Sequence, residues 1–289
     1  MGFKQQLKRA FKYIVKGVPN NYLTVNTYTV APNETMKGKH ILITGGSSGI
    51  GFFAAKKCVA EGANVIITGR NEEKLKKAAV EIGKNCTYLK HDITDIESLS
   101  SLFKNAEKMF GCKIDSLVSN AGVSFHEGSF RNVTPEGWDA QMDTNLKGNY
   151  FIVKEFVKYL ESKDDTSGNI VVITSERSMR ADDIPYGLTK AATNSFIKGI
   201  ARKVISENIR INGVGPGVTE SNMTGFRETK ICMPSGSRAK EYSCLRKWQR
   251  LSVFCFPMCR RAFRAKLSFA TKQDMFQHGN MILIPYNNL

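Results

Sequence analysis

The sequence has little that would place the protein in a membrane or in an oxidising compartment. It contains no run of eighteen apolar residues, so it predicts no membrane-spanning helix. Its seven cysteines are an odd number and none is spaced as C-x-x-C, so neither a disulfide framework nor a metal site is predicted. Free thiols are typical of reducing compartments, and we expect the protein to be cytoplasmic. An apolar fraction of 42% in 289 residues is enough to bury one large core.

Acidic residues are scarce at both ends of the chain, and this scarcity accounts for the net charge of +16. Residues 1–33 carry +5 and residues 226–289 carry +9, whereas residues 34–225 carry only +2. We therefore expect a basic N-terminal extension (1–36), a central domain (37–225) and an atypical basic C-terminal segment (226–289). Nucleic-acid binding is not predicted, because it requires basic residues on one face of a folded module.

The N-terminal extension has the pattern of an amphipathic helix. Apolar residues recur at helical spacing, with lysines mostly between them, at Phe3, Leu7, Phe11, Ile14 and Val18. Such a helix can lie on a membrane surface or dock on its own domain or on a partner subunit. We favour docking over contact with a membrane surface.

From Lys39 onward the predicted strands and helices alternate. Strands are expected at 40–44, 64–68, 86–90, 114–119, 169–174 and 209–214. Helices are expected near 49–61, 71–82, 95–110, 135–162 and 186–206. This alternation predicts an α/β fold, a single domain built on a doubly wound parallel sheet. In such folds the ligand binds at the carboxyl ends of the strands.

The first predicted strand leads into the glycine-rich stretch Thr44-Gly-Gly-Ser-Ser-Gly-Ile-Gly51, after which a helical pattern begins. Strand, turn and helix N-terminus bring backbone N–H groups to one point, where a pyrophosphate can bind. In this interpretation Gly45 permits the tight turn, Gly49 leaves room for the phosphates and Gly51 lets the helix pack closely. Ser47, Ser48 and Ile50 complete the predicted cofactor-binding stretch.

Four further motifs follow at predicted strand ends or on the helices after them: Asn120-Ala121-Gly122, Asn145, Ser175 and Tyr186-x-x-x-Lys190. With the glycine turn, and in this order, they resemble the classical short-chain dehydrogenases/reductases over about residues 37–224. The resemblance implies a Rossmann-type fold, a nicotinamide cofactor and four catalytic residues, namely Asn145, Ser175, Tyr186 and Lys190.

The expected chemistry explains these residue types. A free phenol has a pKa of about 10, too high for ready proton exchange at neutral pH. The nearby ammonium of Lys190 stabilises the phenolate, so Tyr186 can exchange a proton with the substrate oxygen as hydride moves. Ser175, or less favourably Thr174, would hold that oxygen by a hydrogen bond. Asn145 resembles the family's asparagine, which binds a water that links the lysine to solvent.

The spacing Tyr-x-x-x-Lys alone does not identify the catalytic pair. It occurs three times, at Tyr150/Lys154, Tyr159/Lys163 and Tyr186/Lys190, and each pair lies on one helix face. The first two fall within one long predicted helix and are interpreted as packing or solvated residues. Only Tyr186 follows a strand that ends in a hydroxyl residue, so we assign the proton transfer to Tyr186.

Cofactor choice depends on the end of the second strand. An acidic residue there would bind the ribose hydroxyls of NAD(H), whereas this sequence has Arg70, which suits the 2′-phosphate of NADP(H). NADP(H) is therefore favoured over NAD(H). The resemblance adds cofactor contacts from Tyr186 and Lys190 themselves and from three other places: Asp92 and Ile93; Asn120, Ala121 and Gly122; and Pro216, Gly217, Val218 and Thr219.

Beyond Thr224 the resemblance ends, because residues 230–263 show no clear helical or strand period. Residues 279–284 are predicted to pair with the outer edge of the sixth strand. The sequence thus predicts an NADP(H)-dependent oxidoreductase that interconverts a carbonyl and a secondary alcohol, acts on a small molecule and forms a homo-oligomer. The alternative is a dinucleotide-binding protein whose atypical C-terminal segment has cost it turnover.

Overall fold

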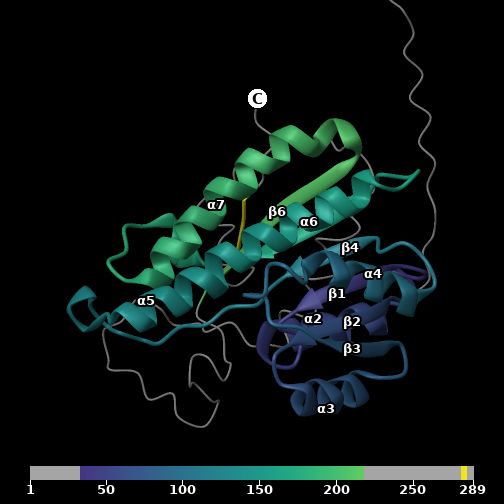
Figure 1. Ribbon diagram of the computed structural model, residues 1–289, viewed down its shortest axis with the longest axis horizontal. Coiled ribbons are helices and arrows are strands. Elements are labelled where there is room, and N and C mark those ends of the chain that lie inside the picture. Colours follow the sequence, from purple (N-terminus) through teal and green to yellow (C-terminus); the bar gives the residue numbers. More distant parts are fainter. Residues whose placement is uncertain (1–32, 218–280, 285–289) are drawn as a thin grey trace, which may run out of the picture. The chain divides into compact units, whose positions relative to one another are not determined.

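The computed structural model describes residues 33–217 and 281–284, and its centre is a seven-stranded sheet (Figure 1). The strand order is β3-β2-β1-β4-β5-β6-β7. The strands are β1 (His40–Thr44), β2 (Asn64–Gly69), β3 (Cys86–Lys90), β4 (Ser116–Ser119), β5 (Gly168–Ile173), β6 (Ile209–Pro216) and β7 (Met281–Ile284). Strands β1 to β6 are parallel, so the predicted doubly wound sheet is confirmed. Their carboxyl ends lie along one edge.

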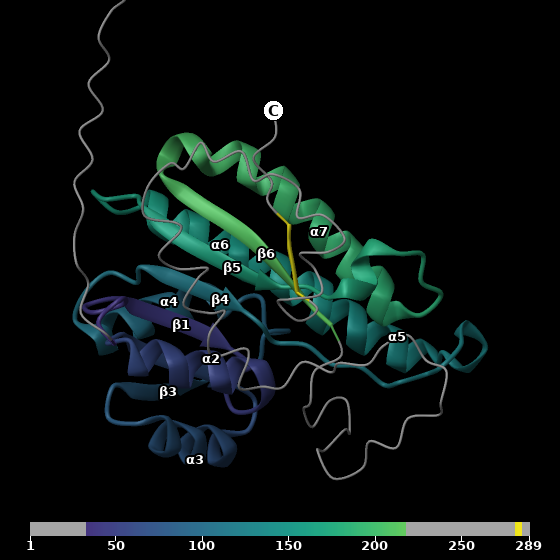
Figure 2. The same ribbon diagram turned by 180° about the vertical axis from the view of Figure 1, so that it is seen from behind.

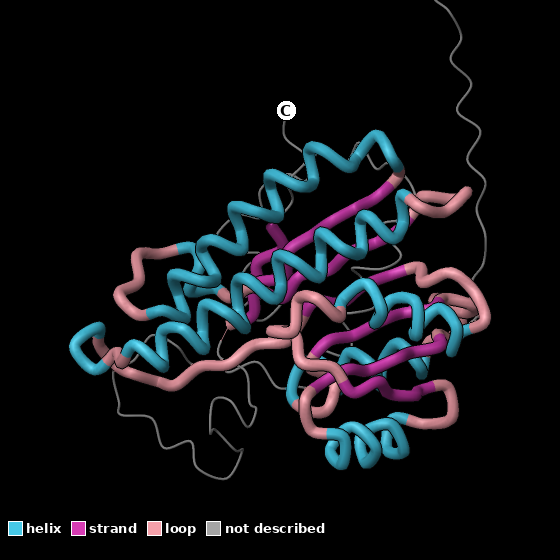
Figure 3. The backbone as a smooth tube through the Cα atoms, in the orientation of Figure 1, coloured by secondary structure: helices cyan, strands magenta, loops and turns pink. Residues whose placement is uncertain are grey.

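Helices cover both faces of the sheet (Figures 1 to 3). The α-helices are α2 (Gly49–Ala60), α3 (Glu72–Ile82), α4 (Leu99–Phe110), α5 (Pro135–Gln141), α6 (Asn149–Glu161) and α7 (Pro185–Val204). The prediction of one helix over 135–162 is correct in extent but misses a change of winding. A π-helix, η2 (Met142–Gly148), separates α5 from α6.

Two separate apolar clusters hold these layers together, because side chains alternate between the two faces of a strand. From β1, Leu42 packs with residues of α4, α6 and α7, including Phe103 and Phe156. Ile41 and Ile43 point to the other face and pack with residues of α2 and α3. All three β1 residues are fully buried, as expected for a strand covered on both faces.

Strand β7 confirms the prediction that residues near 279–284 pair with the sixth strand. It runs antiparallel to β6, and its register places Ile284 opposite Gly213 and Met281 opposite Pro216. A bare sheet edge presents unpaired N–H and C=O groups that invite association with another chain. β7 supplies partners for these groups along four residues of β6.

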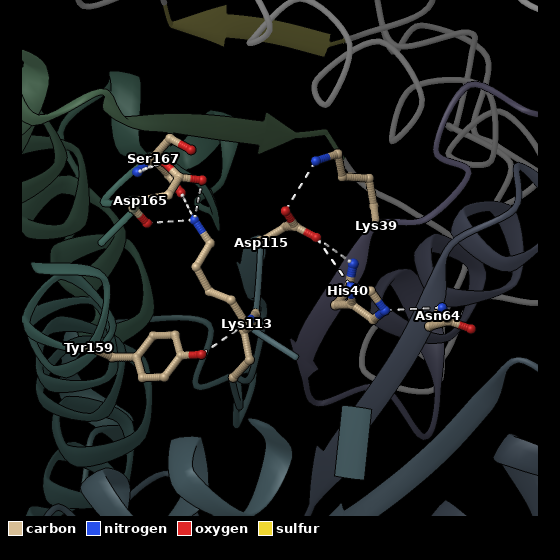
Figure 4. Close-up of polar contacts among 9 residues, drawn as sticks. Lys39, His40, Asn64, Lys113, Asp115, Tyr159, Asp165 and Ser167 are labelled. Atoms are coloured by element: carbon tan, nitrogen blue, oxygen red, sulfur yellow. Dashed lines mark hydrogen bonds and ion pairs between the residues drawn. The ribbon is translucent and has the colours of Figure 1, made fainter. Parts of the chain in front are cut away.

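A polar network lies at the amino-terminal ends of the strands, opposite the edge expected to bind ligand (Figure 4). Asp115, just before β4, accepts the backbone N–H of His40 at 2.9 Å and pairs with Lys39 at 3.1 Å. Lys113 donates to the carboxylate of Asp165 at 2.8 Å. These contacts tie the starts of β1 and β4 to the segment before β5.

Several predictions concern residues outside the described ranges: the helix over 3–18, the contacts of Val218 and Thr219, and the aperiodic stretch 230–263. The division of the chain into 1–36, 37–225 and 226–289 also stays a prediction. Within the described ranges, no helix is both long enough and apolar enough to cross a membrane.

Candidate active site

The glycine turn after β1 has a backbone that favours glycine. Gly45 has φ +65° and Gly49 has φ +56°, values that disfavour other residues. A Cβ on Gly51 would lie 2.5 Å from both the Gly45 carbonyl oxygen and Asn120 Nδ2. Ser48, which precedes α2, makes no side-chain cap to the helix. A phosphate is a suitable partner for the first N–H groups of α2, so this turn fits a pyrophosphate.

Asn120 fastens the end of β4 to this turn. Its side chain donates to the carbonyl oxygens of Thr44 at 2.9 Å and Gly45 at 3.1 Å. In return, Thr44 Oγ1 accepts the N–H groups of Asn120 at 2.9 Å and Ala121 at 3.0 Å. Thr44 was not among the predicted site residues, although its place as the last residue of β1 was a usable signal.

The four predicted catalytic residues come from three parts of the chain, namely η2, the segment after β5 and α7, and they meet beyond the carboxyl ends of β4 and β5. Ser175 follows β5, and its side chain hydrogen-bonds Tyr186 near the start of α7. Lys190, one helical turn later, has its Nζ 5.7 Å from the centroid of the Tyr186 ring and donates to the Ile173 carbonyl at 2.9 Å. Asn145 lies on η2.

The side chains of Asn145 and Lys190 both lie next to Gly122. A Cβ added to Gly122 would lie 3.2 Å from Asn145 Oδ1 and 3.8 Å from Lys190 Nζ. Asn145 is fixed by two hydrogen bonds to the backbone of Val123, one in each direction, at 2.7 and 2.8 Å. The structure thus brings together the catalytic residues that the sequence predicts.

Burial sets the protonation properties of the two central groups. It lowers the pKa of Lys190 to about 8, so the ammonium form still dominates at pH 7. Burial also raises the pKa of Tyr186, whereas the hydrogen bond with Ser175 and the positive charge of Arg177 act in the opposite direction. The pKa of the Tyr186 phenol is therefore determined by competing effects, as expected of a group used for proton transfer.

Asn149 is a buried support that the sequence interpretation missed. Its Nδ2 donates to the carbonyl oxygens of Ala121 at 2.9 Å, Thr144 at 3.0 Å and Asn145 at 3.1 Å, and its Oδ1 accepts from Ser119 at 2.5 Å. A π-helix shifts carbonyls out of the usual α-helical pairing, and Asn149 binds two of them. No sequence motif signalled this role, because an asparagine within a helical pattern has no distinctive spacing.

The remaining predicted cofactor residues lie along the same edge of the sheet. Arg70 is exposed and directly follows β2. After β3, Asp92 accepts the N–H and hydroxyl of Thr94, and Ile93 is buried against Gly148. Pro216 ends β6 and Gly217 follows it.

The two other tyrosines with the same lysine spacing lie elsewhere. Tyr150 is 40% exposed on α6. Tyr159 is a core residue whose hydroxyl accepts the Ile114 N–H at 3.0 Å, at the amino-terminal end of the sheet (Figure 4). Neither is among the residues that gather around Ser175.

Comparison with known proteins agrees with this geometry. A 3-oxoacyl-(acyl-carrier-protein) reductase from Salmonella typhimurium is 33% identical over 192 residues, which cover 66% of this chain and 77% of that protein. An uncharacterized oxidoreductase from Staphylococcus epidermidis is 28% identical over 191 residues, 65% of this chain and 81% of that protein.

Among solved structures, a 3-ketoacyl-(acyl-carrier-protein) reductase from Brucella melitensis, complexed with NADH, superimposes with a TM-score of 0.69. It is 25% identical, and the match covers 78% of this chain and 93% of that one. The model of the short chain dehydrogenase family matches residues 39–231. This chain therefore belongs to the short-chain dehydrogenase/reductase family and is an NAD(P)-dependent oxidoreductase.

Proposed function

We propose that this protein uses NADP(H) to interconvert a carbonyl and a secondary alcohol on a small molecule. The observation that carries the proposal is the group Asn145, Ser175, Tyr186 and Lys190, assembled at the sheet edge where the glycine turn fits a pyrophosphate. When bound, NADP(H) supplies the hydride in reduction, and NADP⁺ accepts it in oxidation.

The side chains divide the proton chemistry among them. In reduction, Ser175 hydrogen-bonds the carbonyl oxygen, and Tyr186 donates its phenolic proton to that oxygen as the carbon is reduced. The product is the alcohol, and the tyrosinate left behind is stabilised by the Lys190 ammonium. Asn145, which like Lys190 lies next to Gly122, would organise the route by which the proton is replaced. Oxidation runs the same steps in reverse.

The preference for NADP(H) rests on Arg70. Its exposed side chain stands directly after β2, and the next residue, Asn71, is committed to capping α3 by accepting the Lys74 N–H at 2.9 Å. A guanidinium is a strong partner for a phosphate. The cofactor residues Gly45, Ser47, Ser48, Gly49, Ile50, Gly51, Asp92, Ile93, Asn120, Ala121, Gly122, Pro216, Gly217, Val218 and Thr219 complete the proposed site.

The decisive test replaces Tyr186 by Phe, which removes only the proton-bearing oxygen. Turnover of a probe panel, an acetoacetyl thioester and simple aromatic ketones with NADPH and NADH, should fall by about 10²-fold or more in the variant. Binding of NADPH should stay within a few-fold. The proposal would be contradicted if the wild-type protein turned over none of the probes, or if the Tyr186→Phe variant remained active.

The matched control is Tyr150→Phe, not Tyr159→Phe. Tyr150 carries the same lysine spacing on an exposed helix face, so its variant should keep full turnover. Removal of the Tyr159 hydroxyl would leave the Ile114 N–H without its partner and destabilise the core. The alternative, a dinucleotide-binding protein without turnover, is not favoured, because the proton-transfer side chains are together.

We also propose a homo-oligomer and a cytoplasmic location. Large apolar side chains are exposed on three successive helices, Trp138 on α5, Tyr150 on α6 and Leu188 on α7, which supports association through this part of the chain. The described cysteines Cys58, Cys86 and Cys112 are free thiols, as suits a reducing compartment. Light scattering on the purified protein would measure the oligomeric state.

A further inference from the structure

The segment between Ser175 and Tyr186 contains a half-buried ion pair that the proposed mechanism does not use. The guanidinium of Arg177 donates to both carboxylate oxygens of Asp182, from Nε at 2.5 Å and from Nη2 at 2.8 Å. The Asp182 side chain is only 6% exposed, and that of Arg177 is 43% exposed. A two-pronged contact of this kind fixes orientation as well as distance.

Asp182 is locked against the start of α7. It accepts the Ile184 N–H at 3.3 Å, just before the helix begins. Its carboxylate also lies directly on Gly187, where an added Cβ would come within 2.1 Å of the carboxylate carbon. Asp182 therefore contacts the residue that follows Tyr186, and it holds Arg177 from there.

Arg177 is also linked to Tyr186 through Ser175. Its backbone N–H donates to Ser175 Oγ at 3.3 Å, and the Ser175 side chain in turn hydrogen-bonds Tyr186. The positive charge of Arg177 acts to lower the pKa of Tyr186, against the larger effect of burial. The Arg177 backbone thus contacts Ser175, and the Asp182 carboxylate contacts Gly187, the residue that follows Tyr186 in the chain.

Several other charged groups lie on α7 or on the elements packed against it. Lys190 lies on the same helix face as Tyr186. Glu176 pairs with Arg180 at 3.0 Å, and Asp143 with Lys147 at 3.3 Å. The other charged residues of these elements are Glu136 and Asp139 on α5, Lys154, Glu155, Lys158 and Glu161 on α6, Glu207 on η4 (Ile205–Glu207), Arg210 on β6, and Asp183 before α7. Among the described residues, Arg177 is a charge outside α7 that acts to lower the pKa of Tyr186.

We propose that Arg177 and Asp182 are positioning residues for Tyr186, in which Asp182 holds the Arg177 guanidinium beside the Ser175–Tyr186 pair. This inference rests on the proposed role of Tyr186 in proton transfer.

The test is a titration of the Tyr186 phenol in the full-length protein. Tyrosinate absorbance is followed against pH for each variant and for the same variant carrying Tyr186→Phe, and the difference isolates this one tyrosine. Arg177→Gln should raise the Tyr186 midpoint by about half to one pH unit, because a nearby positive charge is lost. Arg177→Lys, which keeps the charge, should recover at least about half of that shift.

Arg180→Gln is the matched control, because Arg180 lies in the same loop and pairs with a carboxylate at a similar distance. It should leave the midpoint unchanged. In an Asp182→Ala background, the shift caused by Arg177→Gln should shrink about twofold or more, since Arg177 is no longer held. An unshifted Arg177→Gln titration, or an equal shift in Arg180→Gln, would overturn the inference.

The same variants are then assayed with the acetoacetyl thioester and NADPH. The pH limb of kcat/KM that depends on Tyr186 should move to higher pH in Arg177→Gln, by the amount found in the titration. Because the titration needs no turnover, the two proposals can fail separately. A shifted titration in a protein without turnover would reject the proposed function and keep this inference.

Discussion

At Gly187 the fold leaves no room for a side chain. The Asp182 carboxylate occupies the place where a Cβ would be, at 2.1 Å. Gly187→Ala should therefore push the loop away from α7, destabilise the fold by about 1–3 kcal/mol and sharply reduce turnover. Gly199→Ala is the control on the same helix, because within the described residues no heavy atom other than its chain neighbours and the adjacent backbone of α7 lies within 4 Å of its Cβ position. It should stabilise the protein by up to about 1 kcal/mol. Urea unfolding and kcat/KM measure both effects, and equal behaviour of the two variants would contradict this account.

Arg70 offers the residue-scale test of cofactor choice. A charge-assisted contact with a 2′-phosphate is worth about 1.5–3 kcal/mol. Arg70→Ala should therefore weaken the binding of NADPH about ten- to a hundredfold and change the binding of NADH little. Lys76→Ala, on the exposed part of α3, should change neither affinity. Fluorescence titration with both cofactors gives the values. Equal affinity of the parent protein for NADH and NADPH would refute the preference.

At the scale of an element, the π-helix depends on one buried side chain. Asn149→Leu keeps a similar volume but leaves Ser119 and the carbonyls of Ala121, Thr144 and Asn145 without their partner. Each unsatisfied buried group costs about 1–3 kcal/mol, so we expect a loss of several kcal/mol and faster amide exchange across 142–148. Ser119→Ala removes one of the four hydrogen bonds and should cost less than half as much. A neutral Asn149→Leu would show that the hydrogen bonds do not support η2.

Strand β7 is the second element whose contribution can be measured. Deletion of 279–289 exposes the backbone edge of β6 from Gly213 to Pro216, which should lower the melting temperature and promote aggregation. Deletion of 285–289 alone keeps β7 and is the control. Light scattering and thermal unfolding report the outcome. A soluble 279–289 deletion with an unchanged melting temperature would mean that β7 does not stabilise the sheet.

At the scale of the whole molecule, burial of Lys190 should make stability depend on pH. Its pKa falls from about 10.5 in the unfolded chain to about 8 in the fold, so the unfolded chain binds this proton more tightly. Folding therefore bears a penalty of about 3 kcal/mol below pH 8, which disappears as the pH rises from about 8 to about 10.5.

Lys190→Met should remove this penalty while abolishing turnover. The variant should be more stable than the parent at pH 7, and the advantage should vanish by about pH 10.5. Urea unfolding of both proteins across this range gives the difference in their free energies of unfolding. The titrations of buried thiols cancel in this difference, because both proteins contain them. A difference that stays constant with pH would contradict the assignment of the penalty to Lys190.

The sequence predicts the sheet well because burial on both faces leaves a continuous apolar pattern, as in Ile41-Leu42-Ile43. It also predicts which residues gather at the strand ends, since parallel strands bring their carboxyl ends to one edge. The winding of η2 and the Arg177–Asp182 pair escape prediction. Both depend on contacts between segments, such as Asn149 with Ala121 and Asp182 with Gly187, that have no local sequence signature.

The register of β7 has a further consequence for ligand binding. Met281 and Ile282 stand opposite Pro216 and Gly215, the residues that lead into the proposed cofactor contacts at Gly217, Val218 and Thr219. A cofactor that binds more tightly when β7 is paired with β6 must also favour that pairing, because linked equilibria bias one another by the same free energy in both directions. Through such coupling, a strand more than sixty residues further along the chain would contribute to the affinity for the cofactor, and its amide exchange should slow when NADPH is added.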